Sequence, residues 1–180
     1  MFRLFHGCVP LFILGFAPLV SALPVAATGH PTALGGVDED ELECPENVEI
    51  EGYRTRLIET AFEAVRRYPN VPHRKNQARI IDELVRAALE LDQPELALRM
   101  IPSASNWRRG SGYAHYSEYC AEHGFDDAAR KYAQIALEVV ESEGMTEGQK
   151  WRADQVRSFV GRTWVRLGEV ERALAAEAGY

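Results

Sequence analysis

The chain has 180 residues and carries 27 acidic against 20 basic side chains, which gives a formal net charge of −7. The excess of acid is confined to residues 23–52, which hold eight Asp and Glu residues and no Lys or Arg. Residues 53–180 are neutral, with 19 acidic and 19 basic side chains. A neutral domain with interleaved charges lacks the concentrated basic face that nucleic-acid binding requires, so we exclude a nucleic-acid partner.

The N-terminus has the pattern of a secretory signal peptide. One arginine precedes an apolar run at residues 9–20, and small residues then lead to a plausible cleavage point after Ala22. An uncleaved anchor is the alternative, but the run is shorter than the roughly 20 apolar residues of a spanning helix and contains Pro10 and Pro18. We expect a signal peptide at residues 1–22 and a secreted or periplasmic protein whose membrane contact ends with cleavage.

Residues 23–48 mix the acidic side chains with glycine and proline and show no hydrophobic period. Such a composition cannot bury enough apolar surface to fold, so it predicts a disordered acidic leader. The leader is either a solvated spacer or a tether for a basic partner. The predicted organisation is therefore a signal peptide at 1–22, a leader at 23–48 and one helical domain at 49–180.

Two cysteines remain after removal of the signal peptide, Cys44 in the leader and Cys120 on a predicted helix. An oxidising compartment would permit a disulfide between them. A buried Cys120 that packs as a small hydrophobic residue is the alternative. The sequence leaves the choice open.

Apolar residues recur at three- and four-residue intervals through most of the domain, and no stretch alternates long enough to predict a strand. Tyr68 to Pro72 should end the first helix and place His73 in a loop. The fold class is therefore all-α. The predicted helices span Ile50 to Arg67, Ala78 to Leu91, Pro94 to Ile101, Ser111 to His123, Asp126 to Ser142, Lys150 to Leu167 and Glu169 to Ala178.

A helix-turn signature occurs three times in these helices. A turn-forming residue lies five positions before a small residue that opens the next helix. The three pairs are Asp92 with Ala97, Gly124 with Ala129, and Gly168 with Ala173. This spacing predicts antiparallel helical hairpins stacked as a short α-solenoid.

With these alanines aligned, the preceding helices share a pattern of large and small positions. Leu84, Tyr116 and Val160 hold the large position, Val85, Ser117 and Gly161 its neighbour, and Ala88, Cys120 and Trp164 a later packing position. Over about residues 75–180 the chain resembles the tetratricopeptide repeat family or one of its helical-hairpin relatives. It departs from that pattern in the uneven spacing of the alanines and in Pro102, which shortens the first hairpin.

The resemblance implies a groove lined by the first helix of each hairpin and an exported, non-enzymatic module that binds a peptide or protein partner. Arg162 and Arg166 are neighbours at i, i+4, so they should repel each other and favour an acidic partner. The groove positions that the resemblance implies are Arg79, Asp82, Glu83, Arg86, His115, Glu118, Glu122, Phe159, Arg162 and Arg166.

The alternative is an envelope or polysaccharide-acting enzyme, or an enzyme subunit, with Glu118 as its minimum catalytic group. The sequence gives no catalytic motif, no metal ligand set and no cofactor signature. His115 and His123 lie two helical turns apart, about 12 Å, which is too far to share a metal ion. Tyr113, Tyr116 and Tyr119 form a stripe that we interpret as core. We therefore predict neither catalytic residues nor a cofactor.

Overall fold

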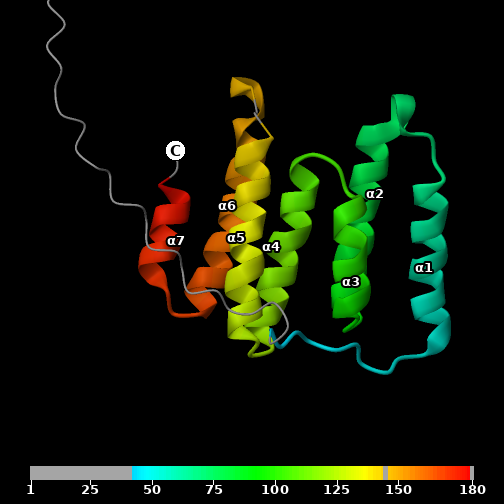
Figure 1. Ribbon diagram of the computed structural model, residues 1–180, viewed down its shortest axis with the longest axis horizontal. Helices are drawn as coiled ribbons and strands as arrows, with labels where there is room; N and C mark the ends of the chain where they lie inside the picture. Colours follow the sequence, from blue (N-terminus) through cyan, green and yellow to red (C-terminus); the bar gives the residue numbers. More distant parts are fainter. Residues whose placement is uncertain (1–41, 144–145, 179–180) are drawn as a thin grey trace, which may run out of the picture. The chain divides into compact units, whose positions relative to one another are not determined.

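The computed structural model describes residues 42–143 and 146–178 (Figure 1). Within these residues it contains α-helices and short 3-10 turns but no strand, which confirms the all-α class. The predicted signal peptide and most of the predicted leader lie outside the described residues. The helices are α1 (Gly52–Arg66), α2 (Asn70–Glu90), α3 (Pro94–Met100), α4 (Trp107–Glu122), α5 (Asp126–Ser142), α6 (Lys150–Arg166) and α7 (Val170–Glu177), with 3-10 turns η2 (Ile101–Ser103) and η3 (Glu147–Gln149).

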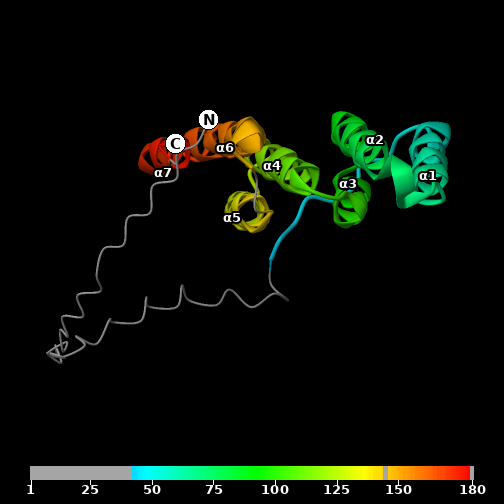
Figure 2. The same cartoon turned by 90° about the horizontal axis from the view of Figure 1, so that it is seen from above.

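Neighbouring helices pair in chain order. Helices α2 and α3, α4 and α5, and α6 and α7 pack against each other, while α4 also packs on α2 and α6. Seen from above, α3 and α5 lie on the same side of the row formed by α2, α4 and α6 (Figure 2). The first helices of successive hairpins are therefore direct neighbours. No helix of the described residues is long and apolar enough to cross a bilayer.

The three predicted turns share one backbone geometry. Asp92, Gly124 and Gly168 all have positive φ angles, of 52°, 82° and 75°. This conformation ends a helix because the amide that follows can bond back to a carbonyl of the last turn. The three equivalent bonds run from Gln93 N to Ala88 O at 2.9 Å, from Phe125 N to Cys120 O at 2.9 Å, and from Glu169 N to Trp164 O at 2.8 Å. Their acceptors are the three residues that the sequence aligned at one packing position.

Helix α2 begins eight residues before its predicted start, so the prediction that His73 lies in a loop is wrong. Pro69 precedes the helix and Pro72 is its third residue. The first amides of a helix have no acceptor within it, so a proline there removes no hydrogen bond. Two prolines that suggested a break therefore sit at a helix start.

Helix α4 also starts earlier than predicted, at Trp107 and not at Ser111. The side chain of Asn106 caps it by accepting a hydrogen bond from Arg108 N at 3.2 Å. Gly110 lies within this added turn, where α4 and α5 approach closely. A Cβ atom on Gly110 would lie 2.9 Å from a methyl of Val140 and 3.0 Å from the carbonyl oxygen of Ala136.

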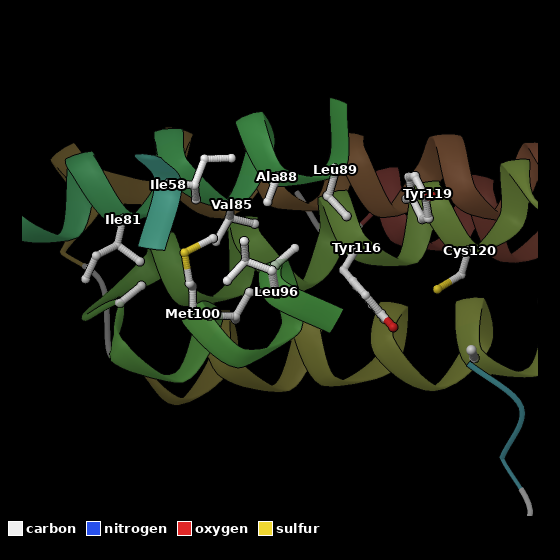
Figure 3. Close-up of a cluster of buried hydrophobic side chains, with 14 of the residues drawn as sticks. Ile58, Ile81, Val85, Ala88, Leu89, Leu96, Met100, Tyr116, Tyr119 and Cys120 are labelled. Carbon is white, nitrogen blue, oxygen red and sulfur yellow. The ribbon is translucent and has the colours of Figure 1, made fainter. Parts of the chain in front are cut away.

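The core is made of two clusters of buried side chains. The first involves α1 to α5 and includes Tyr116, Cys120 and Met100 (Figure 3). The second lies between α4, α5, α6 and α7 and includes Trp107, Val160 and Trp164. The three aligned alanines, Ala97, Ala129 and Ala173, are buried. Tyr116 and Tyr119 are buried and Tyr113 is half-buried, so the tyrosine stripe is core, as predicted.

Residues 42–51, which we call the N-terminal segment, are extended and lie against the helices. Leu42 and Cys44 pack on the first cluster and Pro45 is buried. Val48 N donates to Asp92 O at 2.9 Å, and Asn47 Oδ1 accepts from Glu95 N at 3.0 Å. The sequence placed residues 42–48 in a disordered leader. That boundary is wrong because the apolar residues and the backbone polar groups of this stretch find partners at the α2–α3 turn and the core.

Candidate functional site

Helices α2, α4 and α6 present side chains from three successive hairpins on one face, which we call the α2–α4–α6 face. It comprises Glu83 and Arg86 of α2, His115, Glu118 and Glu122 of α4, and Phe159, Arg162 and Arg166 of α6. All eight are predicted groove positions. Ring and ion-pair contacts join the residues of α4 to those of α6, while Glu83 and Arg86 of α2 pair with each other and act on the pKa of His115.

An aromatic pair lies where α4 meets α6. The rings of His115 and Phe159 have centroids 4.4 Å apart and are tilted by 38°. The guanidinium of Arg162 lies over the Phe159 ring, 4.8 Å from its centroid. His115 and Phe159 are half-buried, so part of each ring is open to solvent. The pair offers an apolar surface with a cation beside it.

His115 is surrounded by positive charge from both neighbouring helices. Burial, together with the guanidinium groups of Arg86 and Arg162, lowers its pKa to about 4, and Glu83 acts in the opposite direction. The imidazole is therefore neutral at pH 7. A neutral ring can take part in an aromatic contact without the cost of removing a charge from water.

Arg162 and Arg166 are already paired with acidic side chains of α4. Arg162 lies 3.0 Å from a carboxylate oxygen of Glu118, and Arg166 lies 3.6 Å from the other. Arg166 also pairs with Glu122 at 2.5 Å. The sequence predicted that these two arginines repel each other in the free protein, and the structure adds that Glu118 and Glu122 compensate both charges. An acidic partner would have to compete with these two carboxylates.

Glu118 is the most enclosed acid of the face, with 13% of its side chain exposed. Burial raises its pKa, and Glu122 raises it further, while Arg162 and Arg166 act in the opposite direction. Two guanidinium groups thus hold the carboxylate in one position between α4 and α6. These ion pairs link α4 to α6 near the aromatic pair.

On α2, Arg86 pairs with Glu83, one turn away. The remaining two predicted groove positions do not join the contacts of the face. Arg79 is exposed on α2. Asp82 is only 5% exposed and bonds to Arg108 of α4 at 2.7 Å. Burial raises the pKa of Asp82, while Arg108 and the nearby hydroxyl of Ser111 act in the opposite direction. Asp82 therefore joins α2 to α4 from the inside.

A polar pocket of about 480 Å³ was not anticipated from the sequence. Its lining comes from the start of α2, the η2–α4 loop and the end of α5. Arg109 contributes a buried Nε atom that has no hydrogen-bond partner in the described part of the chain. The lining residues are Arg74, Gln77, Pro102, Ser103, Ala104, Ser105, Asn106, Arg109 and Glu143. None belongs to the α2–α4–α6 face, and only the polar run before α4 could have indicated the pocket.

Comparisons with family models, with curated proteins and with solved structures find no match to this chain. The described residues contain no group of three or more His, Cys, Asp or Glu side chains that could hold a metal ion. The residues of the α2–α4–α6 face are therefore the basis for a proposed function.

Proposed function

We propose that this chain is an exported protein-interaction module that binds a peptide or protein partner through the α2–α4–α6 face. The observation that carries the proposal is the partly open His115–Phe159 pair, bordered by Arg86 and Arg162. Aromatic and arginine side chains at the centre of a surface are the residue types that most often dominate protein binding. Export is part of the proposal and derives from the signal-like N-terminus.

The charges of the face define the partner that it suits. Among the eight residues of the face, the charges of three glutamates balance those of three arginines, and each arginine pairs with a glutamate. The face therefore has no unpaired arginine to attract a purely acidic chain. Apolar contact with the aromatic pair must therefore supply much of the affinity. A carboxylate of the partner can then compete with Glu83 for Arg86 or with Glu118 for Arg162, since guanidinium groups recognise carboxylates through paired hydrogen bonds. We infer a segment with an apolar or aromatic residue next to an acidic one.

The enzymatic alternative has less support. Its minimum requirement was a catalytic Glu118, but that carboxylate is engaged by Arg162 and Arg166. A general acid must present its carboxyl group to a substrate, and both oxygens of Glu118 face guanidinium groups instead. Glu118 is better suited to position the arginines than to transfer a proton.

Selection of peptides from a random display library tests the proposal. The purified full chain serves as bait, and an identical bait carrying Phe159→Ala serves for counter-selection. We expect enriched sequences that contain an aromatic or branched apolar residue beside Asp or Glu and that are lost on the variant. Enrichment no higher than on a blank surface, or sequences that the variant retains equally, would refute the proposal.

A further inference from the structure

The N-terminal segment brings Cys44 to the same core cluster that contains Cys120. Cys120 is fully buried on α4, and Cys44, 76 positions earlier in the sequence, is half-buried against the cluster. In Figure 3 the cyan N-terminal segment lies below the Cys120 side chain. Both residues are free thiols in the structure. The two cysteines that follow the predicted signal peptide therefore lie in one packed region.

Hydrogen bonds made by the residues that follow Cys44 hold it in this place. Beyond it, Val48 donates to Asp92 O, and the Gln93 side chain donates to Val48 O. Asn47 accepts from Glu95 N at 3.0 Å and donates to the Glu95 carboxylate at 3.2 Å. Asn47 and Val48 thus make four hydrogen bonds that fix the N-terminal segment to the α2–α3 turn. These two residues lie three and four positions after Cys44.

The pKa shifts of Cys120 and Tyr132 are consistent with a position of Cys44 close to both residues. Burial raises the pKa of Cys120 to about 12, and Cys44 is the next contributor in the same direction. Both thiols also raise the pKa of Tyr132 on α5, where burial is the main cause. Cys44, Cys120 and Tyr132 therefore form one cluster of polarisable groups at the junction of the segment with α4 and α5.

We propose that Cys44 and Cys120 form a disulfide that fastens the N-terminal segment to α4. Two features favour the bond. The segment is held beside α4 before oxidation, and the two thiols come from distant parts of the sequence, so their link would close a long loop of the unfolded chain. The proposal does not rest on partner binding, because it concerns residues outside the α2–α4–α6 face.

The chemistry proceeds by thiol–disulfide exchange with a disulfide oxidant, for which oxidised glutathione serves as the probe. The thiolate of Cys44 attacks one sulfur of glutathione disulfide, forms a mixed disulfide and releases the first glutathione thiolate. The thiolate of Cys120 then attacks Cys44 Sγ and releases the second. Overall, two protein thiols lose two electrons and two protons, and one glutathione disulfide becomes two glutathione thiols. Because burial raises the pKa of Cys120, the closing step should accelerate about tenfold per pH unit below that pKa.

The test uses the full chain with Cys8→Ser, so that only Cys44 and Cys120 remain. Folded protein is incubated with oxidised glutathione, and thiols are then counted in denaturant. We expect the count to fall from two to zero in a monomer. Without reduction, trypsin should release the peptide that ends at Arg54 joined to the peptide Gly110–Arg130. Oxidation should raise the melting midpoint by roughly 5–15 °C, and dithiothreitol should reverse the increase.

A matched control moves the first thiol by one residue, with Cys44→Ser and Glu43→Cys in the same chain. Glu43 is exposed, so its replacement should acquire glutathione and leave Cys120 unreacted. Three results would overturn the proposal. They are a Cys44–glutathione adduct with Cys120 still free, a bridge between two chains, and a bridge that forms as fast in the control as in the original pair.

Discussion

The hydroxyl of Thr163 on α6 lies 2.9 Å from the hydroxyl of Ser117 on α4, and both side chains are fully buried. Ser117 Oγ donates its proton to the Ala114 carbonyl at 2.8 Å. A hydroxyl has a single proton, so Thr163 must be the donor to Ser117. This chain of bonds joins the two helices that carry His115 and Phe159.

Replacing Thr163 by Val should therefore destabilise the fold by about 1–2 kcal/mol, because Ser117 loses a donor without a change in shape. Ser117→Ala should cost a similar amount, since it leaves the Thr163 hydroxyl buried without a partner. The double variant should cost clearly less than the sum of the two. Urea unfolding of the four proteins measures the difference. Strictly additive costs would show that the two hydroxyls do not interact.

Two glycines should respond in opposite ways to the same substitution. Gly124 has a φ of 82°, so Gly124→Ala should cost about 1–2 kcal/mol, although nothing lies within 4 Å of the added methyl. Gly161 lies inside α6 with equally open space, and Gly161→Ala should stabilise by about 0.5–1 kcal/mol. Thermal unfolding of the two variants provides the comparison. Shifts of the same sign would argue against the turn geometry at Gly124.

Ala129 tests the predicted alignment of the hairpins. It is fully buried where α5 meets the first core cluster, so Ala129→Leu should overpack the contact and destabilise by about 1–3 kcal/mol. Glu138→Ala is the control, because Glu138 is exposed on the same helix and bonds only to Gln134 in the described residues. Its melting midpoint should change far less. Equal changes would place Ala129 outside the core.

His115 should make stability depend on pH between about 4 and 6.5. Its pKa is about 4 in the fold and 6.5 for an exposed imidazole. As the pH falls through this interval, the unfolded chain binds a proton that the folded chain does not, so stability falls, by up to about 3 kcal/mol. The raised pKa values of Asp82 and Glu118 act in the opposite direction and are common to both proteins compared.

The measurement compares unfolding free energies of the original chain and His115→Gln from pH 7 to pH 4. The difference between the two curves isolates the imidazole. We expect the original chain to lose stability relative to the variant as the pH falls. Parallel curves would contradict the placement of His115 against Phe159 and between two arginines.

Local spacing predicted the hairpins well. A turn-forming residue ends one helix, and a small residue five positions later lets the next helix pack closely against the first. Both effects depend on residues that are near each other in the sequence. The same alignment brought His115 and Phe159 together, because residues at equivalent positions of stacked helices become neighbours.

Long-range pairing could not be predicted in the same way. Asp82 bonds to Arg108, which the sequence places 26 residues away, so its burial depends on the packing of two helices. Glu118 neutralises Arg162 for the same reason. The N-terminal segment is acidic and lacks a hydrophobic period, yet Leu42, Cys44 and Pro45 pack on a surface made by other helices.

The central claim is that a partner binds at the His115–Phe159 pair, and an affinity measurement tests it most directly. A labelled peptide from the library selection is titrated by fluorescence anisotropy against the original chain, Phe159→Ala and Tyr53→Ala. Tyr53 is an exposed aromatic residue of α1, outside the face, and serves as the control. We predict at least about tenfold weaker binding for Phe159→Ala and little change for Tyr53→Ala, with unchanged circular dichroism. Equal affinity for the original chain and Phe159→Ala would contradict the claim.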